Sequence, residues 1–246
     1  MTKSRRHVFV TGGTGSVGQA LVRAFVLSDY KVTFQFHSNE TVARALEKEC
    51  KAEAIQLNFE LGELSLPESA VDVVVNNAGI NIANELSHEI SPDDWNRTLA
   101  VNITAPYLII RRYLPAMCDN GWGRIINISS IYGLTGAENN LPYNVSKHGM
   151  AGLTKTIARE YGKRGITCNE ICPGPISSEL MERIGKKRAA IEGISMEEYY
   201  DEVKEEIPAG RLAEPSEVAD LAVFFASPAA QYINGISIPL DGGMLA

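Results

Sequence analysis

The 246-residue sequence predicts an α/β fold in which a parallel sheet of about seven strands is flanked by helices. Short apolar runs alternate with helical patterns from one end to the other, which is typical of consecutive β–α–β units. A glycine-rich turn joins the first predicted strand to the first predicted helix, and polar residues follow several later strands. The length and the 45% hydrophobic content suit a single domain over residues 1–246 with its own core.

The elements of the first half follow from apolar and β-branched runs separated by helical spacing. We expect strands at 8–10, 31–36, 54–57 and 71–75, and helices at 16–28 and 41–50. Ser91, Pro92 and the two aspartates that follow form a strong helix start, because they offer a capping hydroxyl, a first-turn proline and acids at the positive end of the dipole. This helix should reach about residue 117 and bend near Pro106.

The second half continues the same alternation. We expect strands at 124–128, 166–171 and 235–240. We also expect a helix at 143–163, which Gly165 terminates, and a helix from Pro215 to residue 225. The charged, helical stretch between Ile176 and Pro208 interrupts the rhythm. It predicts a small helical lobe at about 177–208, inserted over the sheet, rather than a second domain.

Composition excludes several classes of function. The formal net charge of −7 argues against a nucleic-acid partner, because phosphate binding needs a basic surface. No apolar run approaches the roughly 20 residues of a membrane span, and the run after the basic residues 3–7 is too short for a signal peptide. We expect a cytoplasmic protein without a membrane partner.

The cysteines do not suggest a metal site. Cys50, Cys118, Cys168 and Cys172 have no second pair or nearby histidine that would complete a zinc set. Reduced, mostly buried thiols are expected, and no metal.

The glycine-rich turn at residues 11–18 follows the first strand and opens the first helix. Glycines there permit a tight turn and a close approach of the backbone to a pyrophosphate, while the helix N-terminus offers free N–H groups. No Gly-Lys-Ser/Thr follows, so the pattern favours a Rossmann-type, doubly wound sheet with a dinucleotide over a nucleoside triphosphate. A purely structural turn is the alternative. The candidate cofactor-binding residues of this turn are Gly12, Thr14, Gly15, Ser16, Val17 and Gly18.

The end of the second strand bears on the choice of cofactor. An NAD ribose usually meets an acid there, but no acid occurs before Glu40. His37 and Ser38 could instead hydrogen-bond a 2′-phosphate, although no arginine is present in this turn. NADP(H) is therefore the expected cofactor, with NAD(H) possible.

Tyr143 and Lys147 lie four residues apart on a predicted helix, and hence on one face. A nearby ammonium favours the phenolate and lowers the pKa of a tyrosine, so the pair suits general acid/base work on a carbonyl or carbinol oxygen. Ser130 follows another strand, where its hydroxyl could bond the same oxygen. Taken alone, a Tyr-x-x-x-Lys pair is often a solvated helix face.

With these motifs in their order and spacing, the chain resembles the compact short-chain dehydrogenases/reductases over nearly its whole length. The motifs are the glycine turn, Asn76-Asn77-Ala78-Gly79, Asn102, Ser130 thirteen residues before Tyr143, Lys147, Pro173-Gly174-Pro175-Ile176 and Asp241-Gly242-Gly243. The resemblance implies that Tyr143 is the acid/base, that Ser130 positions the substrate oxygen and that Lys147 binds the nicotinamide ribose. It also implies a homotetramer, or a dimer, formed through the helix at 143–163 and the last helix and strand.

The resemblance further implies the remaining site roles. Asn102 would hold a water that links Lys147 to solvent. The remaining residues expected around the cofactor are Asn58 and Phe59 near the adenine, Asn76, Ala78 and Gly79 at the adenosine ribose, and Pro173, Gly174 and Ile176 at the nicotinamide.

The chain departs from the family pattern at three places. Ser16 stands where compact members usually have glycine, which puts the pyrophosphate contact in doubt. Asn58 replaces the usual aspartate. The stretch between Asn58 and Asn76 is short for the family's usual helix, so that face of the sheet should be less covered.

The leading hypothesis for function is an NADPH-linked reductase of a 3-oxoacyl thioester carried on acyl carrier protein or CoA. A dehydrogenase of a sugar, polyol or hydroxy acid is the second hypothesis, and a non-catalytic dinucleotide sensor is the third. The presence of all four catalytic candidates, Asn102 included, speaks against the sensor. The apolar residues of the lobe either line a pocket or pack its helices, and the run at 186–188 either meets an acidic carrier or is a solvated face.

Overall fold

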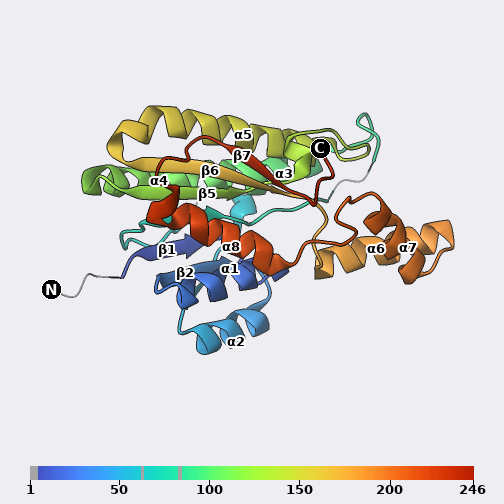
Figure 1. The fold of residues 1–246 in the computed structure, drawn as a ribbon, viewed down its shortest axis with the longest axis horizontal. Coiled ribbons are helices and arrows are strands. Elements are labelled where there is room, and N and C mark those ends of the chain that lie inside the picture. The colour runs from blue at the N-terminus through green and yellow to red at the C-terminus, as the bar shows by residue number, and fades with distance from the viewer. Residues whose placement is uncertain (1–4, 62–63, 83–84) are drawn as a thin grey trace.

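A computed structural model describes residues 5–61, 64–82 and 85–246, and it has the predicted parallel sheet at its centre (Figure 1). The strand order is β3-β2-β1-β4-β5-β6-β7, with every neighbouring pair parallel. The strands are β1 His7–Val10, β2 Lys31–Phe36, β3 Glu53–Gln56, β4 Val73–Asn76, β5 Gly123–Ile128, β6 Ile166–Pro173 and β7 Ser237–Leu240. The order reverses between β1 and β4, which is where doubly wound sheets open a ligand crevice at their carboxyl ends.

Helices cover both faces of this sheet, with α4 and α5 on one side and α1, α2 and α8 on the other (Figure 1). The helices are α1 Ser16–Leu27, α2 Glu40–Cys50, α3 Pro92–Leu99, α4 Ala105–Asn120, α5 Leu141–Tyr161, α6 Glu179–Glu192, α7 Met196–Glu205 and α8 Pro215–Ala226. Short turns of helix lie at η1 Phe59–Leu61, η2 Ala100–Thr104, η3 Ile131–Gly133, η4 Gly162–Arg164 and η5 Pro228–Ala230. The predicted Rossmann-type α/β class is confirmed.

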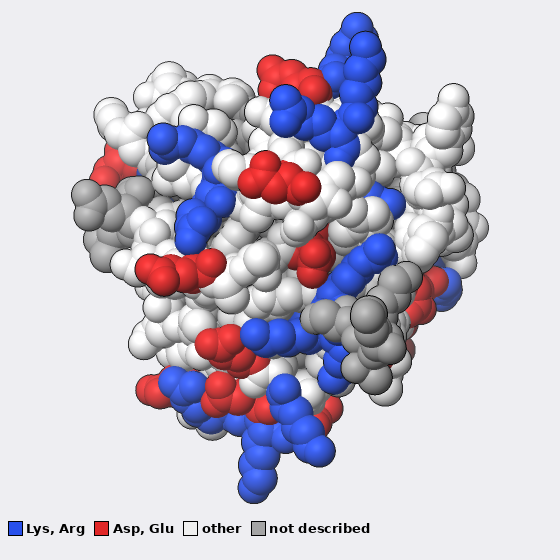
Figure 2. Space-filling model, turned by 90° about the vertical axis from the view of Figure 1, so that its left-hand side faces the viewer, with Lys and Arg blue, Asp and Glu red and all other residues white. Residues whose placement is uncertain are grey.

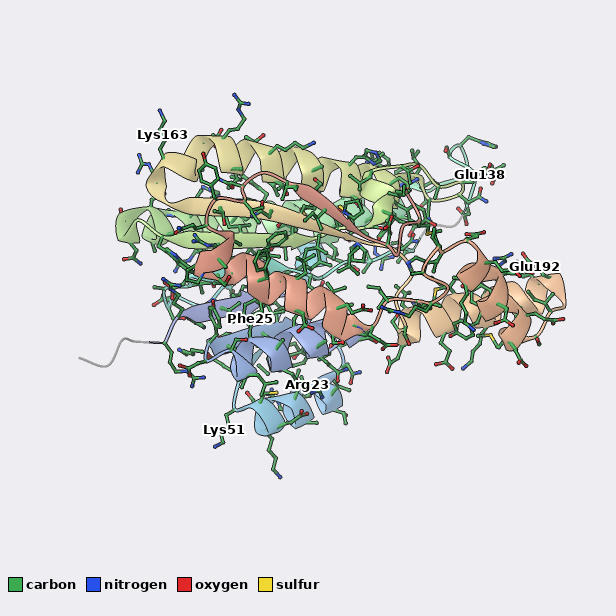
Figure 3. All side chains as sticks on the ribbon, viewed as in Figure 1. Arg23, Phe25, Lys51, Glu138, Lys163 and Glu192 are labelled. Atoms are coloured by element: carbon green, nitrogen blue, oxygen red, sulfur yellow. The ribbon has the colours of Figure 1, made fainter. Side chains whose placement is uncertain are left out.

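Two apolar cores lie between these layers. Phe25 of α1, labelled in Figure 3, is fully buried in the first core. This core also contains residues of α2, of α8 and of one face of the sheet. Tyr113 of α4 and Ile157 of α5 belong to the second core on the opposite face. The inner strands β1, β4 and β5 are buried on both faces, which agrees with their largely apolar sequences.

The helix predicted to run to about residue 117 and bend near Pro106 is irregular just before that proline. After α3 the chain makes a π-helical turn, η2, and then continues as α4 to Asn120. Pro106 has no N–H to donate to the carbonyl of Asn102, four residues earlier, so the regular α pattern is interrupted there. Such π turns often occur at functional sites.

The stretch between β3 and β4 has little helix, as expected. Within its described part, the only helical turn is η1, and Leu64 and Leu66 pack against the second core without forming a helix. In the described part of this stretch, irregular chain takes the place of the family's usual helix.

The helices α6 and α7 lie within residues 177–208 and project from the end of the sheet where the strands finish (Figure 1). They have a small core of their own around Tyr199, Val203 and Ile207. The opposite end of the molecule, shown in Figure 2, carries basic and acidic side chains interspersed over its surface. In the described ranges, no helix is both long and apolar enough to cross a membrane.

Candidate active site

The glycine turn forms a closed cradle between β1 and α1. Gly12 has φ +64°, a conformation that favours glycine, and the Gly15 N–H donates to the Gly12 carbonyl at 3.2 Å. A Cβ on Gly18 would lie 2.0 Å from the Gly12 oxygen, so only glycine lets the helix start so close to the turn. Gly15 and Ser16 begin α1 here, and their side of the turn offers the N–H groups that an anion needs. These residues fit a pyrophosphate.

Gln35, which the sequence analysis did not select, and Asn77 of the Asn-Asn-Ala-Gly motif hold this cradle in place. The side chain of Gln35 accepts from Gly12 N at 2.9 Å and donates to the Leu57 carbonyl at 2.7 Å. The amide of Asn77 donates to the carbonyls of Thr11 and Gly12. A glutamine in the otherwise apolar end of β2 was the available signal for the first.

The three catalytic candidates come together at the ends of β5 and α5. Ser130 follows β5 and accepts the N–H of Tyr132 at 3.2 Å, which fixes its hydroxyl at the start of η3. Tyr143 is in the first turn of α5, and the Lys147 ammonium lies 5.4 Å from the centre of its ring. Lys147 Nζ also donates to the Ile128 carbonyl at 3.0 Å. The predicted constellation therefore exists as a spatial cluster.

Burial dominates the electrostatics of this cluster. It raises the pKa of Tyr143, and hydrogen bonding with Ser130 acts in the opposite direction. It lowers the pKa of Lys147 from 10.5 to about 8, with the Glu170 carboxylate as the largest opposing influence. The expected lowering of the Tyr143 pKa is therefore not found, because desolvation of the phenolate outweighs its favourable neighbours. Tyr143 is a protonated phenol at neutral pH and is ready to act as an acid.

Asn102 lies in the π turn and is fully buried. Its side chain bonds both backbone groups of Ile80, at 2.8 and 2.9 Å, and donates to the Ser146 hydroxyl at 3.0 Å. Ser146 in turn donates to the carbonyl of Tyr143 at 2.7 Å. The side chain thus ties the loop after β4 to α5, which leaves the backbone carbonyl as the group that could hold a water.

Gly79 leaves room beside Lys147, the candidate catalytic lysine. A Cβ there would be 3.5 Å from Lys147 Nζ and 3.6 Å from the Asn102 side-chain oxygen. The Ala78 N–H donates to the Thr11 hydroxyl at 2.9 Å. Asn76, by contrast, is buried in the sheet, where its amide donates to Asn127 at 2.8 Å. Its side chain is held inside the sheet and not in the crevice.

The segment after β6 closes the other side of the crevice. Pro173 ends the strand, Gly174 packs so closely that a Cβ would lie 3.0 Å from Asp241, and Ile176 pairs with Ala213. The chain then enters α6, whose Glu179 N–H approaches the Ser16 hydroxyl at 3.4 Å. The serine that replaces glycine in the turn therefore contacts the lobe.

The loop residues expected near the adenosine lie beyond β2 and β3. His37 and Ser38 are exposed, and the nearest acid, Glu40, pairs with Arg44 of α2 at 3.4 Å. Asn58 accepts the N–H of Glu60 at 2.9 Å, and Phe59 is buried in the second core. Only the backbone of Phe59 remains for a ligand, because its side chain packs inward.

The cysteines agree with the expectation of reduced, largely buried thiols. Cys168 and Cys172 are buried, Cys50 and Cys118 are partly buried, and all four are free. In the part of the chain that the structure describes, no cluster of three His, Cys, Asp or Glu side chains is arranged to hold a metal.

Comparison with known proteins places this geometry in a family. A family model described as enoyl-(acyl carrier protein) reductase matches residues 12–245. Acetoacetyl-CoA reductase of Rhizobium meliloti is 33% identical over 246 residues, covering 97% of this chain and 98% of the relative. The 3-oxoacyl-[acyl-carrier-protein] reductase of Aquifex aeolicus is 33% identical over 250 residues, covering 96% and 95%. The crystal structure of an actinorhodin polyketide ketoreductase variant with NADPH superimposes with a TM-score of 0.90 at 28% identity, covering 99% and 98%.

The chain belongs to the short-chain dehydrogenase/reductase family, as its motifs predicted. It is an oxidoreductase that uses NAD(P)(H) and interconverts a carbonyl group and a secondary alcohol.

Proposed function

We propose that this enzyme reduces 3-oxoacyl thioesters to 3-hydroxyacyl thioesters with NADPH. The observation that supports this substrate class is a set of exposed apolar side chains on the segments that follow the central strands. Exposed large apolar side chains come from three segments that follow neighbouring strands, β4, β5 and β6. They are Ile82 and Leu86, Leu134 and Leu141, and Leu180 and Ile184. Such a group suits an acyl chain better than a polyol.

The apolar residues of the lobe have two kinds of surroundings. Met181, Ile194 and Met196 pack against Tyr199 in the lobe's own core. Leu180 and Ile184 of α6 remain 49% and 45% exposed. The outward pair supports the pocket role of the lobe, and the inward group only holds its helices together.

The residues of the cluster supply the proton chemistry of the reduction. When bound, the nicotinamide supplies the hydride that adds to the carbonyl carbon. The Ser130 hydroxyl bonds the carbonyl oxygen, and the protonated Tyr143 gives that oxygen its proton. The Lys147 ammonium, 5.4 Å from the ring centre, stabilises the phenolate left behind. Lys147 and a water at the Asn102 carbonyl then return a proton from solvent to Tyr143.

NADP(H) is the cofactor we propose for this chain. No carboxylate is free at the end of β2 to repel a 2′-phosphate, because Glu40 is paired with Arg44. Arg44, which the sequence analysis did not select, lies 5.7 Å from the ring of Phe36, the last residue of β2. Its guanidinium therefore lies near the end of β2 and adds to His37 and Ser38 as a binding candidate.

The carrier of the acyl group is better assigned to CoA or a pantetheine arm than to an acidic protein surface at 186–188. Two of the three basic residues in that run are neutralised within the lobe. Lys186 pairs with Glu182 at 2.6 Å, and Arg188 pairs with Glu192 and Glu202 at 2.9 and 2.8 Å. The run is mostly a solvated face.

We also propose that the enzyme is a homotetramer or a homodimer in the cytoplasm. Supporting the association, several large apolar side chains are exposed on and after the last helix: Phe224, Tyr232, Ile236 and Leu245. Tyr232 is 99% exposed, which is unusual for an aromatic ring without a partner.

A comparison of substrates tests the proposed function. We expect NADPH-dependent reduction of acetoacetyl-CoA, with a higher kcat/KM for a 3-oxohexanoyl thioester, because a longer chain covers more of these apolar side chains. A matched panel of keto-sugars and keto-acids provides the control. Faster turnover of a polar ketone than of either thioester would contradict the proposal and favour the sugar, polyol or hydroxy-acid hypothesis.

A further inference from the structure

The face of the sheet beneath α5 holds a buried carboxylate that the proposed mechanism has not used. Glu170 lies in the middle of β6 with 0% exposure, and it is the only buried acid in the described ranges. In register it lies between Asn127 of β5 and Ser237 of β7. Burying an ionised carboxylate costs free energy unless other groups compensate the charge. The groups around Glu170 should therefore include one that offsets this cost.

Hydrogen bonding satisfies only half of this carboxyl group. One oxygen of Glu170 accepts the Ser237 hydroxyl at 2.5 Å. The other, Oε1, is buried without a hydrogen-bond partner. The bond to Ser237 needs only one side-chain oxygen, which an uncharged side chain could also supply. This bond therefore does not explain why residue 170 carries a carboxyl group.

Lys147 is a buried charged group of the opposite sign. It is 3% exposed, and its ammonium donates to the Ile128 carbonyl on β5. No salt bridge to Lys147 occurs in the described part of the chain. A buried ammonium with a single neutral acceptor is incompletely compensated.

The two charged side chains belong to the same interface, between α5 and β6. Lys147 and Thr154 lie seven residues apart on α5, hence on one face of that helix. Thr154 accepts the Asn127 amide at 2.8 Å, and Asn127 is the register neighbour of Glu170. Ile128, which binds Lys147, is paired with Ile171, the residue after Glu170. The stripe of α5 that carries Lys147 therefore packs on the part of β6 that carries Glu170.

The other groups around Lys147 offer no equivalent negative charge. On its own helix it meets Tyr143, whose pKa burial raises. On β6 it meets Cys172, whose thiol pKa is raised to about 12, so that the thiol is neutral at physiological pH. Two further neighbours are uncharged: Asn102, whose side-chain oxygen lies near Gly79 as Lys147 Nζ does, and Ser129, whose hydroxyl donates to the Lys147 carbonyl. Glu170 is also the strongest influence that opposes the lowering of the Lys147 pKa by burial.

We propose that Glu170 is a positioning residue of the active site: its buried carboxylate is the counter-charge that keeps Lys147 in the ammonium form. Through Lys147 it sustains the charge beside Tyr143. The catalytic half of this proposal rests on the proposed reductase function, whereas the pairing of the two buried charges does not.

A stability cycle tests the pairing without any substrate. Glu170→Gln keeps the shape and removes the charge, and Lys147→Met removes its partner. At pH 7, we expect Glu170→Gln to lower the folding equilibrium constant about tenfold more in the wild-type background than in the K147M background, equivalent to one pKa unit of interaction. Glu170→Thr runs in parallel, in case glutamine packs poorly. Folding of an E170 variant only in the K147M background would also support the pairing.

Equal losses in the two backgrounds would overturn the proposal. Glu170 would then be a neutral acid or a purely structural residue. Ser237→Ala is the matched control, because it removes the hydroxyl from Glu170 and leaves both charges. It should retain the coupling between Glu170 and Lys147.

The pH profile tests the consequence for the reaction. Reduction needs the ammonium, so kcat/KM falls as pH rises through the pKa of Lys147. Glu170→Gln should move this alkaline limb to lower pH by about one unit, and Glu170→Asp should largely restore it. A uniform loss of kcat/KM with an unmoved limb would contradict the positioning role. If wild type does not reduce the thioester, the proposed function fails, while the stability cycle still decides the pairing.

Discussion

At the scale of one residue, the burial of the Lys147 ammonium is a clear free-energy cost of this site. Burial lowers its pKa from 10.5 to about 8. The unfolded chain therefore binds more protons than the folded protein between these two values, and the free energy of unfolding should rise with pH through this window. Below pH 8 the full cost of the buried ammonium is present.

Lys147→Met removes this titrating group and leaves Glu170 without its counter-charge. The free energy of unfolding of wild type should rise relative to that of this variant by up to about 3 kcal/mol between pH 8 and pH 10.5, because only the wild type contains the lysine that becomes neutral in this window. Urea unfolding at a series of pH values measures both curves. A difference that stays constant with pH would show that Lys147 does not titrate in this window.

The catalytic residues are also where sequence reasoning reached furthest. Ser130, Tyr143 and Lys147 follow from chemistry and spacing, and the structure brings them together. Gln35 and Glu170 were not found, because each is a polar residue within a strand that belongs to no recognisable motif. Only the three-dimensional neighbours of such a residue reveal what it bonds.

At the scale of elements, the junction of β1 and α1 depends on two glycines in different ways. Gly18→Ala should weaken NADPH binding and destabilise the fold by about 1–3 kcal/mol, because its Cβ would meet the Gly12 oxygen at 2.0 Å. Gly15→Ala is the matched control. Its Cβ would meet only the same oxygen at 3.7 Å, and its φ of −73° suits alanine. Thermal melts and fluorescence titration with NADPH measure both, and equal effects would contradict the cradle geometry.

The end of β2 is the second element with a testable role. His37→Asp should shift the ratio of kcat/KM for NADPH over NADH toward NADH by about tenfold or more, since like charges repel. Position 37 is the choice because Phe36 is fully buried, whereas His37 is exposed. His37→Asn has the same shape without the charge and should leave the ratio nearly unchanged. An unchanged ratio in His37→Asp would place the specificity determinant elsewhere, with Arg44 the next residue to change.

Element boundaries were predictable where local signals were strong. The helix start at Ser91 and the strand at Lys31–Phe36 appear as expected. The π turn at Ala100–Thr104 was not predicted, beyond a bend assigned to Pro106. A π turn depends on how the helix packs against its neighbours, and the local sequence supplies only the missing N–H.

For the whole molecule, the exposed apolar surface around α8 and the C-terminus predicts self-association. Analytical ultracentrifugation should show a tetramer or a dimer at micromolar concentration. Phe224→Ser together with Tyr232→Ser should shift the distribution toward smaller species with an unchanged far-UV spectrum, because both rings are exposed within the chain. A wild type that sediments as a monomer would contradict this prediction.

The overall topology was predictable because the β–α alternation fixes the class and the connection rules limit the strand order. The position of the lobe was predictable only as an interruption of that rhythm. Which of its apolar residues face inward was not, since Leu180 and Met181 are neighbours in sequence with opposite surroundings. Substrate choice depends on this distinction.

The most direct test of the account is the oxidation of NADPH by purified enzyme with acetoacetyl-CoA, compared with the Tyr143→Phe variant. We predict turnover by wild type and a loss of at least about 10³-fold in Tyr143→Phe, with NADPH affinity changed less than about threefold, because the phenol supplies a proton and little binding. Wild-type turnover that survives in Tyr143→Phe would contradict the central claim that Tyr143 is the acid of this reductase.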